Sequence, residues 1–173
     1  TRWIRQVIFE LDEDSQLENA FEDPITDSIV TKGDPTQEVI SFEVFDDEGE
    51  KVPVKIEPST INDGSKQTKH SAEIKVPPGK TFRVHKKFRL EKELVGEYSI
   101  LTNKPIMKYY SMEFKIAPNL PGHVEVTPWK NGFKLEPDGP IYGVANTFAS
   151  VKVKMKGPIY SGHGFIPVWS VTK

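Results

Sequence analysis

The sequence predicts an all-β fold, a single antiparallel β-sandwich of about ten strands that occupies residues 1–173 as one domain. Apolar residues recur at alternate positions in segment after segment, and this period of two is typical of strands with one buried face. The 14 prolines and 12 glycines lie mostly between these segments, where turns need them. A minimal immunoglobulin domain has about seven strands in about 100 residues. We therefore expect an enlarged immunoglobulin-like or jelly-roll sandwich, with a closed β-barrel as the alternative.

The N-terminal segment predicts the first strand and the single short helix that we expect in this chain. Residues 3–11 carry alternating apolar side chains and form the expected strand. Ser15 and Glu18 then have the spacing of a capping box, which is typical of a helix start. Pro24 would end this helix after one or two turns, because proline cannot continue the backbone hydrogen bonds.

Further alternations and turn signals place the other strands along the chain. Residues 46–49, three acids followed by a glycine, predict the tip of a hairpin. Pro53 lies within the return strand, where a proline favours an edge position or a bulge. The further strands are expected at residues 25–31, 38–45, 52–56, 70–76, 80–90, 109–116, 124–129, 147–155 and 164–171.

The segment from Lys80 to Leu90 is the strongest candidate for a functional surface. From Phe82 to Leu90, one set of alternate positions is apolar apart from Lys86, and the other set would meet solvent. Residues on one face of a strand repeat about every 6.6 Å, so the solvent face would carry a regular row of positive charge. Such a row suits phosphates, nucleotides, anionic lipid headgroups or an acidic protein surface. Its members are Arg83, His85, Lys87 and Arg89.

The charge distribution along the chain leaves two other interpretations of this row open. The net charge is −2, which argues against a general nucleic-acid binder. Between residues 11 and 50 the only cationic side chain is Lys32, whereas lysine and arginine outnumber the acids between residues 51 and 115. The acidic segment could therefore pair with the cationic row within the same molecule. The row could also be a solvated face that keeps a strand edge from pairing with other chains.

A second candidate surface consists of aromatic loops. The sequence Gly-Pro-Ile-Tyr occurs at residues 139–142 and again at residues 157–160. Two such loops on one rim of a sandwich would form a stacking platform for sugars or bases, and the alternative is a pair of similar loops without a role. The candidate residues are Trp129, Tyr142, Tyr160 and His163.

Several kinds of chemistry have no support in the sequence. The chain has no cysteine, so disulfides, thiolate metal sites and cysteine nucleophiles are excluded. It also lacks a zinc-protease helix motif, an EF-hand loop, a P-loop, a dinucleotide fingerprint and a nucleophile elbow. We therefore expect no catalysis, no metal and no cofactor.

These observations predict a sensory or recognition domain that binds an anionic ligand or an acidic protein partner. The first residue is threonine, which favours a domain of a larger protein, including one that a segment outside this chain anchors in a membrane. A structural subunit that self-associates through strand edges is one alternative, and a carbohydrate-binding module is the other. The lack of cysteine fits the cytoplasm, although exported proteins without cysteine are also common.

Overall fold

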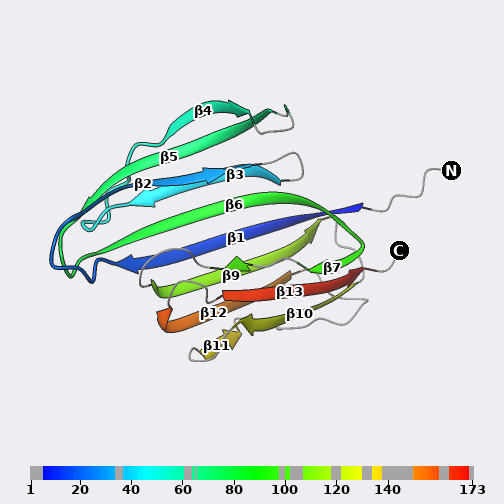
Figure 1. Cartoon of the computed structure of the whole chain (residues 1–173). Coiled ribbons are helices and arrows are strands. Elements are labelled where there is room, and N and C mark those ends of the chain that lie inside the picture. Colours follow the sequence, from blue (N-terminus) through cyan, green and yellow to red (C-terminus); the bar gives the residue numbers. More distant parts are fainter. Residues whose placement is uncertain are drawn as a thin grey trace.

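The computed structural model describes most of the chain, and the described part consists of strands, turns and bends without a helix. Thirteen strands in this part form three antiparallel sheets (Figure 1). The predicted all-β class is therefore confirmed. The described residues are 6–33, 37–60, 64, 66–97, 100–101, 107–117, 122–129, 134–137, 150–159 and 164–171.

One large sheet forms the main layer of the molecule. Its six strands follow in the order β11 (Lys134–Pro137), β12 (Ser150–Ile159), β9 (Met107–Ala117), β1 (Gln6–Glu18), β6 (Thr81–Glu93) and β3 (Gln37–Phe45). Within the described part this sheet ends at β3 on one side and at β11 on the other, so its strands do not close into a barrel.

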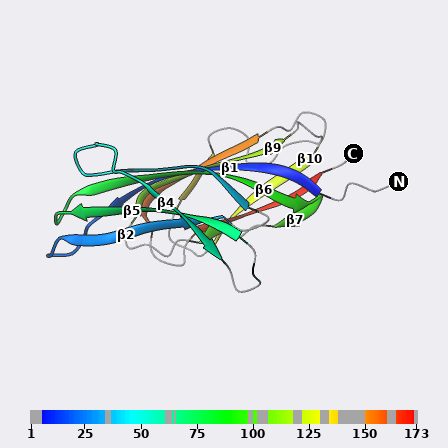
Figure 2. The ribbon, with the colours of Figure 1, turned by 90° about the horizontal axis from the view of Figure 1, so that it is seen from above.

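Two smaller sheets complete the fold. The first has the order β2 (Ile25–Lys32), β5 (Lys66–Val76) and β4 (Lys55–Thr60). The second contains β10 (Gly122–Trp129), β13 (Gly164–Val171), β7 (Val95–Glu97) and β8 (Ile100–Leu101), with β8 also pairing with β13. Viewed from above, β2 and β5 lie toward one end of the molecule and β7 and β10 toward the other (Figure 2).

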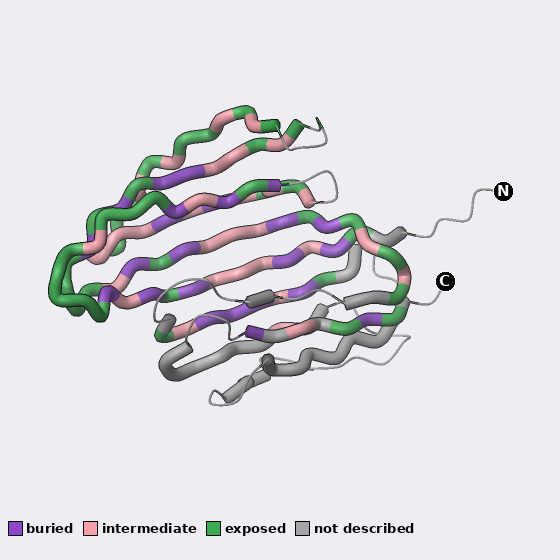
Figure 3. The backbone as a smooth tube through the Cα atoms, viewed as in Figure 1, coloured by how far each residue is buried: buried purple, intermediate pink, exposed green. Residues whose placement is uncertain are grey.

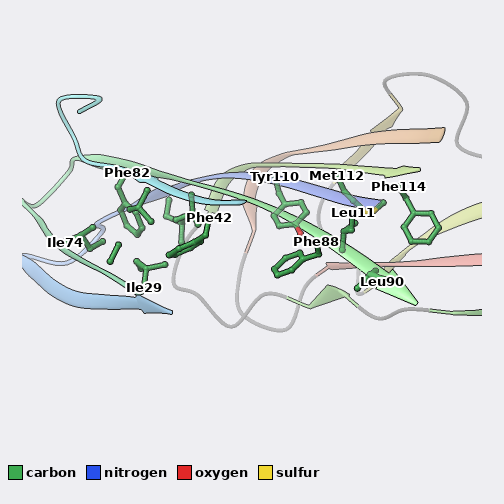
Figure 4. Close-up of a cluster of buried hydrophobic side chains, with 14 of the residues drawn as sticks. Leu11, Ile29, Phe42, Ile74, Phe82, Phe88, Leu90, Tyr110, Met112 and Phe114 are labelled. Carbon is green, nitrogen blue, oxygen red and sulfur yellow. The ribbon is translucent and has the colours of Figure 1, made fainter. Parts of the chain in front are cut away.

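The core lies between the large sheet and the two small ones, as expected for a sandwich. At one end, the Trp169 ring of β13 lies 4.9 Å from Phe9 and 5.4 Å from Phe114 of the large sheet, measured between ring centroids. At the other end, Ile29 and Ile74 of the three-stranded sheet belong to the same buried cluster (Figure 4). The large sheet contributes to it Phe9, Leu11, Leu17, Phe42, Val44, Phe82, Val84, Phe88, Leu90, Tyr110, Met112 and Phe114.

The short helix predicted after residue 15 is wrong. Strand β1 continues to Glu18 and pairs with β6 on one side and with β9 on the other. The Ser15 hydroxyl donates to the Val84 carbonyl at 3.3 Å instead of capping a helix, and Leu17 is 1% exposed. Pairing with two neighbouring strands and burial of Leu17 therefore outweigh the local capping signal.

Candidate functional site

The predicted cationic row lies on the outer face of β6, between two strands whose outer faces are acidic. Strand pairing places Glu10, Asp12 and Asp14 of β1 on one side of the row, and Glu38 and Glu43 of β3 on the other. The sheet register thus brings together charges that are far apart in the sequence.

The strands differ in how far they are buried. Buried and partly buried positions are frequent along β1 and β6, whereas exposed positions predominate along β4 (Figure 3).

Every member of the row has an acidic partner within the chain. Arg83 donates from two nitrogens to the two carboxylate oxygens of Asp14, at 2.7 and 2.8 Å. This hydrogen bonding raises the pKa of Arg83. The remaining contacts are His85 with Asp12 at 2.6 Å and Glu43 at 3.3 Å, Lys87 with Glu10 at 3.7 Å, and Arg89 with Glu38 at 3.0 Å and Glu10 at 3.9 Å.

These ion pairs compensate much of the positive charge of the row. The pairing between the acidic segment and the row, one of the two alternatives from the sequence, is therefore present. An anionic ligand would have to compete with carboxylates that are already in place. Exposed ion pairs contribute only about 0–1 kcal/mol each, so such competition is physically possible. The use of the row as a ligand site stays a prediction.

The aromatic candidates are placed only in part. Trp129 is the last residue of β10 and stands opposite Gly164 of β13 in the register. Tyr142, Tyr160 and His163 lie outside the described residues. The second Gly-Pro-Ile-Tyr sequence was predicted to be a loop, but residues 157–159 belong to strand β12.

The inner face of the large sheet carries an acidic and a basic side chain among its apolar residues. Lys86, which interrupts the apolar alternation of β6, stands opposite Glu13 of β1, and both are partly buried. Burial raises the pKa of the Glu13 carboxyl above its ordinary value of 4.5, while the charge of Lys86 acts in the opposite direction. In the sequence, the sign of this buried charge was the interruption of the apolar alternation by Lys86.

Glu13 and Glu43 should make stability depend on pH in opposite directions. The raised pKa of Glu13 means that its contribution to the free energy of unfolding falls as the pH rises from 4.5 through the folded-state value. Hydrogen bonds from Lys51 and His85 lower the pKa of Glu43, so its contribution is present above pH 4.5 and is lost as the pH falls. Urea unfolding between about pH 3 and pH 8 measures both effects. Glu13→Gln should reduce the loss of stability that accompanies rising pH, and Glu43→Gln should reduce the loss that accompanies falling pH. Unchanged pH profiles in both variants would contradict these assignments.

A groove opens where the chain leaves strand β3. The predicted hairpin tip at residues 46–49 is confirmed: Gly49 has a φ of +84°, and Asp46 donates its N–H to the Glu50 carbonyl at 2.9 Å. The Val52 N–H then donates to the Val44 carbonyl at 2.8 Å. Pro53 follows and has no N–H to donate. The predicted return strand at residues 52–56 does not form as one unit, because β4 begins at Lys55 and pairs with β5 in the other sheet.

Two cavities, each of about 460 Å³, lie along β3 between the diverging sheets. The first is lined by residues 40–43, 51–54, Ile56 and His70. The second is lined by residues 37–39, 66–68, Ile8, Gly33, His70, Arg89 and Glu91. Because both are lined by β3 and share His70, we treat them as one groove, the β3 groove, which follows the strand from Gln37 to Glu43.

The β3 groove offers apolar side chains next to backbone hydrogen-bonding groups. Ile40 is 41% exposed and Ile56 is 62% exposed, which is unusual for isoleucine in a folded domain. In an antiparallel strand, alternate residues direct both backbone groups to the same side. The Val44 carbonyl faces Val52, so the N–H and carbonyl of Phe42 face the groove as well.

The floor of the groove contains a buried polar atom. His70 packs its ring against the edge of Phe42, with the centroids 6.4 Å apart and an interplanar angle of 74°. The Nδ1 atom of His70 is buried, and among the described residues it has no hydrogen-bond partner. Exposed apolar residues, a strand edge and a buried polar atom thus lie together in the β3 groove, which makes it a candidate binding site.

Comparison with known proteins identifies no relative: no family model, no curated protein and no solved structure matches the chain. The part of the chain that the structure describes contains no group of three or more metal-ligating side chains placed to hold an ion. It also contains no helix with the length and apolar character needed to cross a bilayer.

Proposed function

We propose that the chain is a non-catalytic recognition domain that binds an extended segment of a protein partner along the open edge of β3. The observation that carries this proposal is the β3 groove, in which an open strand edge lies beside exposed isoleucines. Addition of a strand to a sheet edge is a common mode of peptide recognition, in which backbone hydrogen bonds supply affinity and side-chain cavities supply specificity. The proposal keeps the class predicted from the sequence and moves the binding surface from the face of β6 to the edge of β3.

The chain itself contains a short example of the proposed binding mode. Lys51 and Val52 already occupy the position next to β3, through a bridge between Phe45 and Lys51 and the hydrogen bond from Val52 to Val44. A bound segment would continue this pairing past the point where Pro53 directs the chain away. Its backbone would meet Phe42, and its apolar side chains would pack against Ile40 and Ile56.

A peptide selection tests this proposal. A random peptide library displayed on phage is selected against the immobilised chain, and enriched peptides are measured by fluorescence anisotropy. We expect peptides that bind the native chain and lose at least about tenfold in affinity to Ile56→Asp, because a carboxylate cannot replace the apolar contact. Hydrogen exchange at the Phe42 amide should slow when the peptide is bound.

The matched control is Val95→Asp, since Val95 is 64% exposed and lies on strand β7, in the other small sheet. Peptide affinity for this variant should stay within about twofold of the native value. Failure to enrich any peptide, or equal losses in both variants, would contradict the proposal. Sedimentation of the native chain identifies the partner further: a concentration-dependent mass that Ile56→Asp abolishes would show that the groove accepts a second copy.

A further inference from the structure

The outer face of the three-stranded sheet places two lysines directly opposite each other. Lys32, the last residue of β2, is paired in the register with Lys69 of β5. Ile29 of β2 and Ala72 of β5 are buried in the core, and each lies three residues from the lysine of its own strand. Because side chains alternate between the two faces of a sheet, both lysines lie on the face away from the core. Lys32 is exposed and Lys69 is partly buried.

Within the described part of the chain, neither of these lysines forms an ion pair. The residue on the other side of Lys69 in the register is Glu57 of β4. Its Oε1 atom contacts the Lys55 ammonium group at 2.8 Å. That hydrogen bond lowers the pKa of the Glu57 carboxyl, and the charge of Lys69 adds to the effect. Glu57 is therefore engaged by Lys55 rather than by the two opposed lysines.

The two opposed lysines, which we call the lysine pair, differ from the cationic row of β6, in which every member has a carboxylate partner. Opposite residues of an antiparallel sheet have Cβ atoms about 4.5–5.5 Å apart, so like charges at such positions destabilise the sheet. An anion held between the two ammonium groups would replace this repulsion by two attractions. Lys32 is also the only cationic side chain between residues 11 and 50, and it lies directly across from another lysine.

We infer that the lysine pair is a binding site for a phosphate group. Each ammonium group can donate up to three hydrogen bonds, and lysine binds phosphate as a point charge. A phosphate ester carries a charge of about −1.5 to −2 near neutral pH, so one such group can engage both lysines. The site goes beyond the proposed function, because neither lysine lines the β3 groove. It also takes up the anionic ligand predicted from the sequence, on a different sheet from the row of β6.

Thermal unfolding at low ionic strength tests this inference in sodium phosphate and in sodium chloride of equal ionic strength at the same pH. Phosphate should raise the melting temperature of the native chain by at least about 2 °C over chloride, because a ligand of the folded state stabilises it by mass action. Lys32→Gln and Lys69→Gln should each reduce this gain by at least about half. In chloride, Lys32→Gln should melt at least as high as the native chain, because the repulsion is removed.

The matched control is Lys75→Gln. Lys75 is exposed on the same strand and the same face as Lys69, but it stands opposite Thr26 instead of a lysine. This variant should keep the full gain in phosphate. Equal gains in the native chain and all three variants would overturn the inference, because they would show only the general stabilisation of folded proteins by phosphate. A melting temperature of Lys32→Gln in chloride more than about 2 °C below that of the native chain would also overturn it.

Two further probes distinguish the sources of the phosphate group. Glycerol 3-phosphate represents a soluble ester, and phosphatidylcholine vesicles with and without phosphatidic acid represent a lipid headgroup. A higher melting temperature with the first, or cosedimentation only with the vesicles that contain phosphatidic acid, identifies the source, and Lys32→Gln should weaken either response. A response to inorganic phosphate alone would identify the free ion as the ligand. Ile56→Asp, which tests the β3 groove, should leave the gain in phosphate unchanged, so the two proposals can fail separately.

Discussion

Replacing Phe114 with alanine is expected to lower the free energy of unfolding by about 3–5 kcal/mol. Phe114 is fully buried on β9, and its ring stacks on Phe9 with centroids 4.5 Å apart. Both rings contact Trp169, the buried aromatic residue of the four-stranded sheet. The substitution would therefore leave a cavity at the interface between two sheets, where the rings can collapse only in part. Urea unfolding followed by tryptophan fluorescence measures the loss.

The control for this substitution is Phe21→Ala, which removes the same atoms from a side chain that is 60% exposed. We expect it to cost less than about 1 kcal/mol. Equal losses from the two variants would contradict the packing described here, because they would show that Phe114 is no more important than a surface phenylalanine.

Replacing Asn19 with alanine is expected to lower the free energy of unfolding by about 2–4 kcal/mol. Asn19 is fully buried where the chain leaves β1, and its amide donates to the carbonyls of Asp23 and Val76, both at 2.9 Å. Its Oδ1 atom accepts from the Phe21 N–H at 2.9 Å. Alanine would leave these three backbone groups without their partner. Because Val76 ends β5, the Asn19 side chain also joins the six-stranded sheet to the three-stranded sheet.

Two variants separate this role from a general effect of substitution. Asn19→Asp keeps the size and the acceptor but turns a second oxygen toward two carbonyls, so it should destabilise the protein about as much as alanine does. Gln16→Ala removes an exposed amide that donates to the Thr81 hydroxyl at 3.2 Å, and should cost less than about 0.5 kcal/mol. Native stability of Asn19→Asp would contradict the hydrogen-bond assignment.

The sequence predicted those strands in which one face is buried and the other exposed. The segment 80–90 is an example: its alternation corresponds to strand β6, with Phe82, Val84, Phe88 and Leu90 buried and Arg83 and Arg89 exposed. The helix expected at residue 15 failed because a capping signal depends on four residues, whereas β1 is stabilised by two strands that are distant in the sequence.

The two candidate surfaces differ in how much of each was predictable. The cationic row was found because it needs only the period of two. Its acidic partners depend on the register, which brings together Asp14 and Arg83, 69 positions apart, and Asp12 and His85, 73 positions apart. The β3 groove was not predicted: Pro53 was expected at an edge position or a bulge of a return strand, whereas residues 52–54 form no strand. The position of β4 depends on its pairing with β5, which no local pattern reports.

The order of apolar and polar residues thus determined which segments form strands and which side of each strand is buried, because the direction of a side chain along a strand alternates with every residue. The tertiary structure alone decided which strands are neighbours, which charges are paired, and which sheet edge stays open. These properties arise from contacts between segments far apart in the chain, so they depend on register and on the competition among whole strands for the same edge.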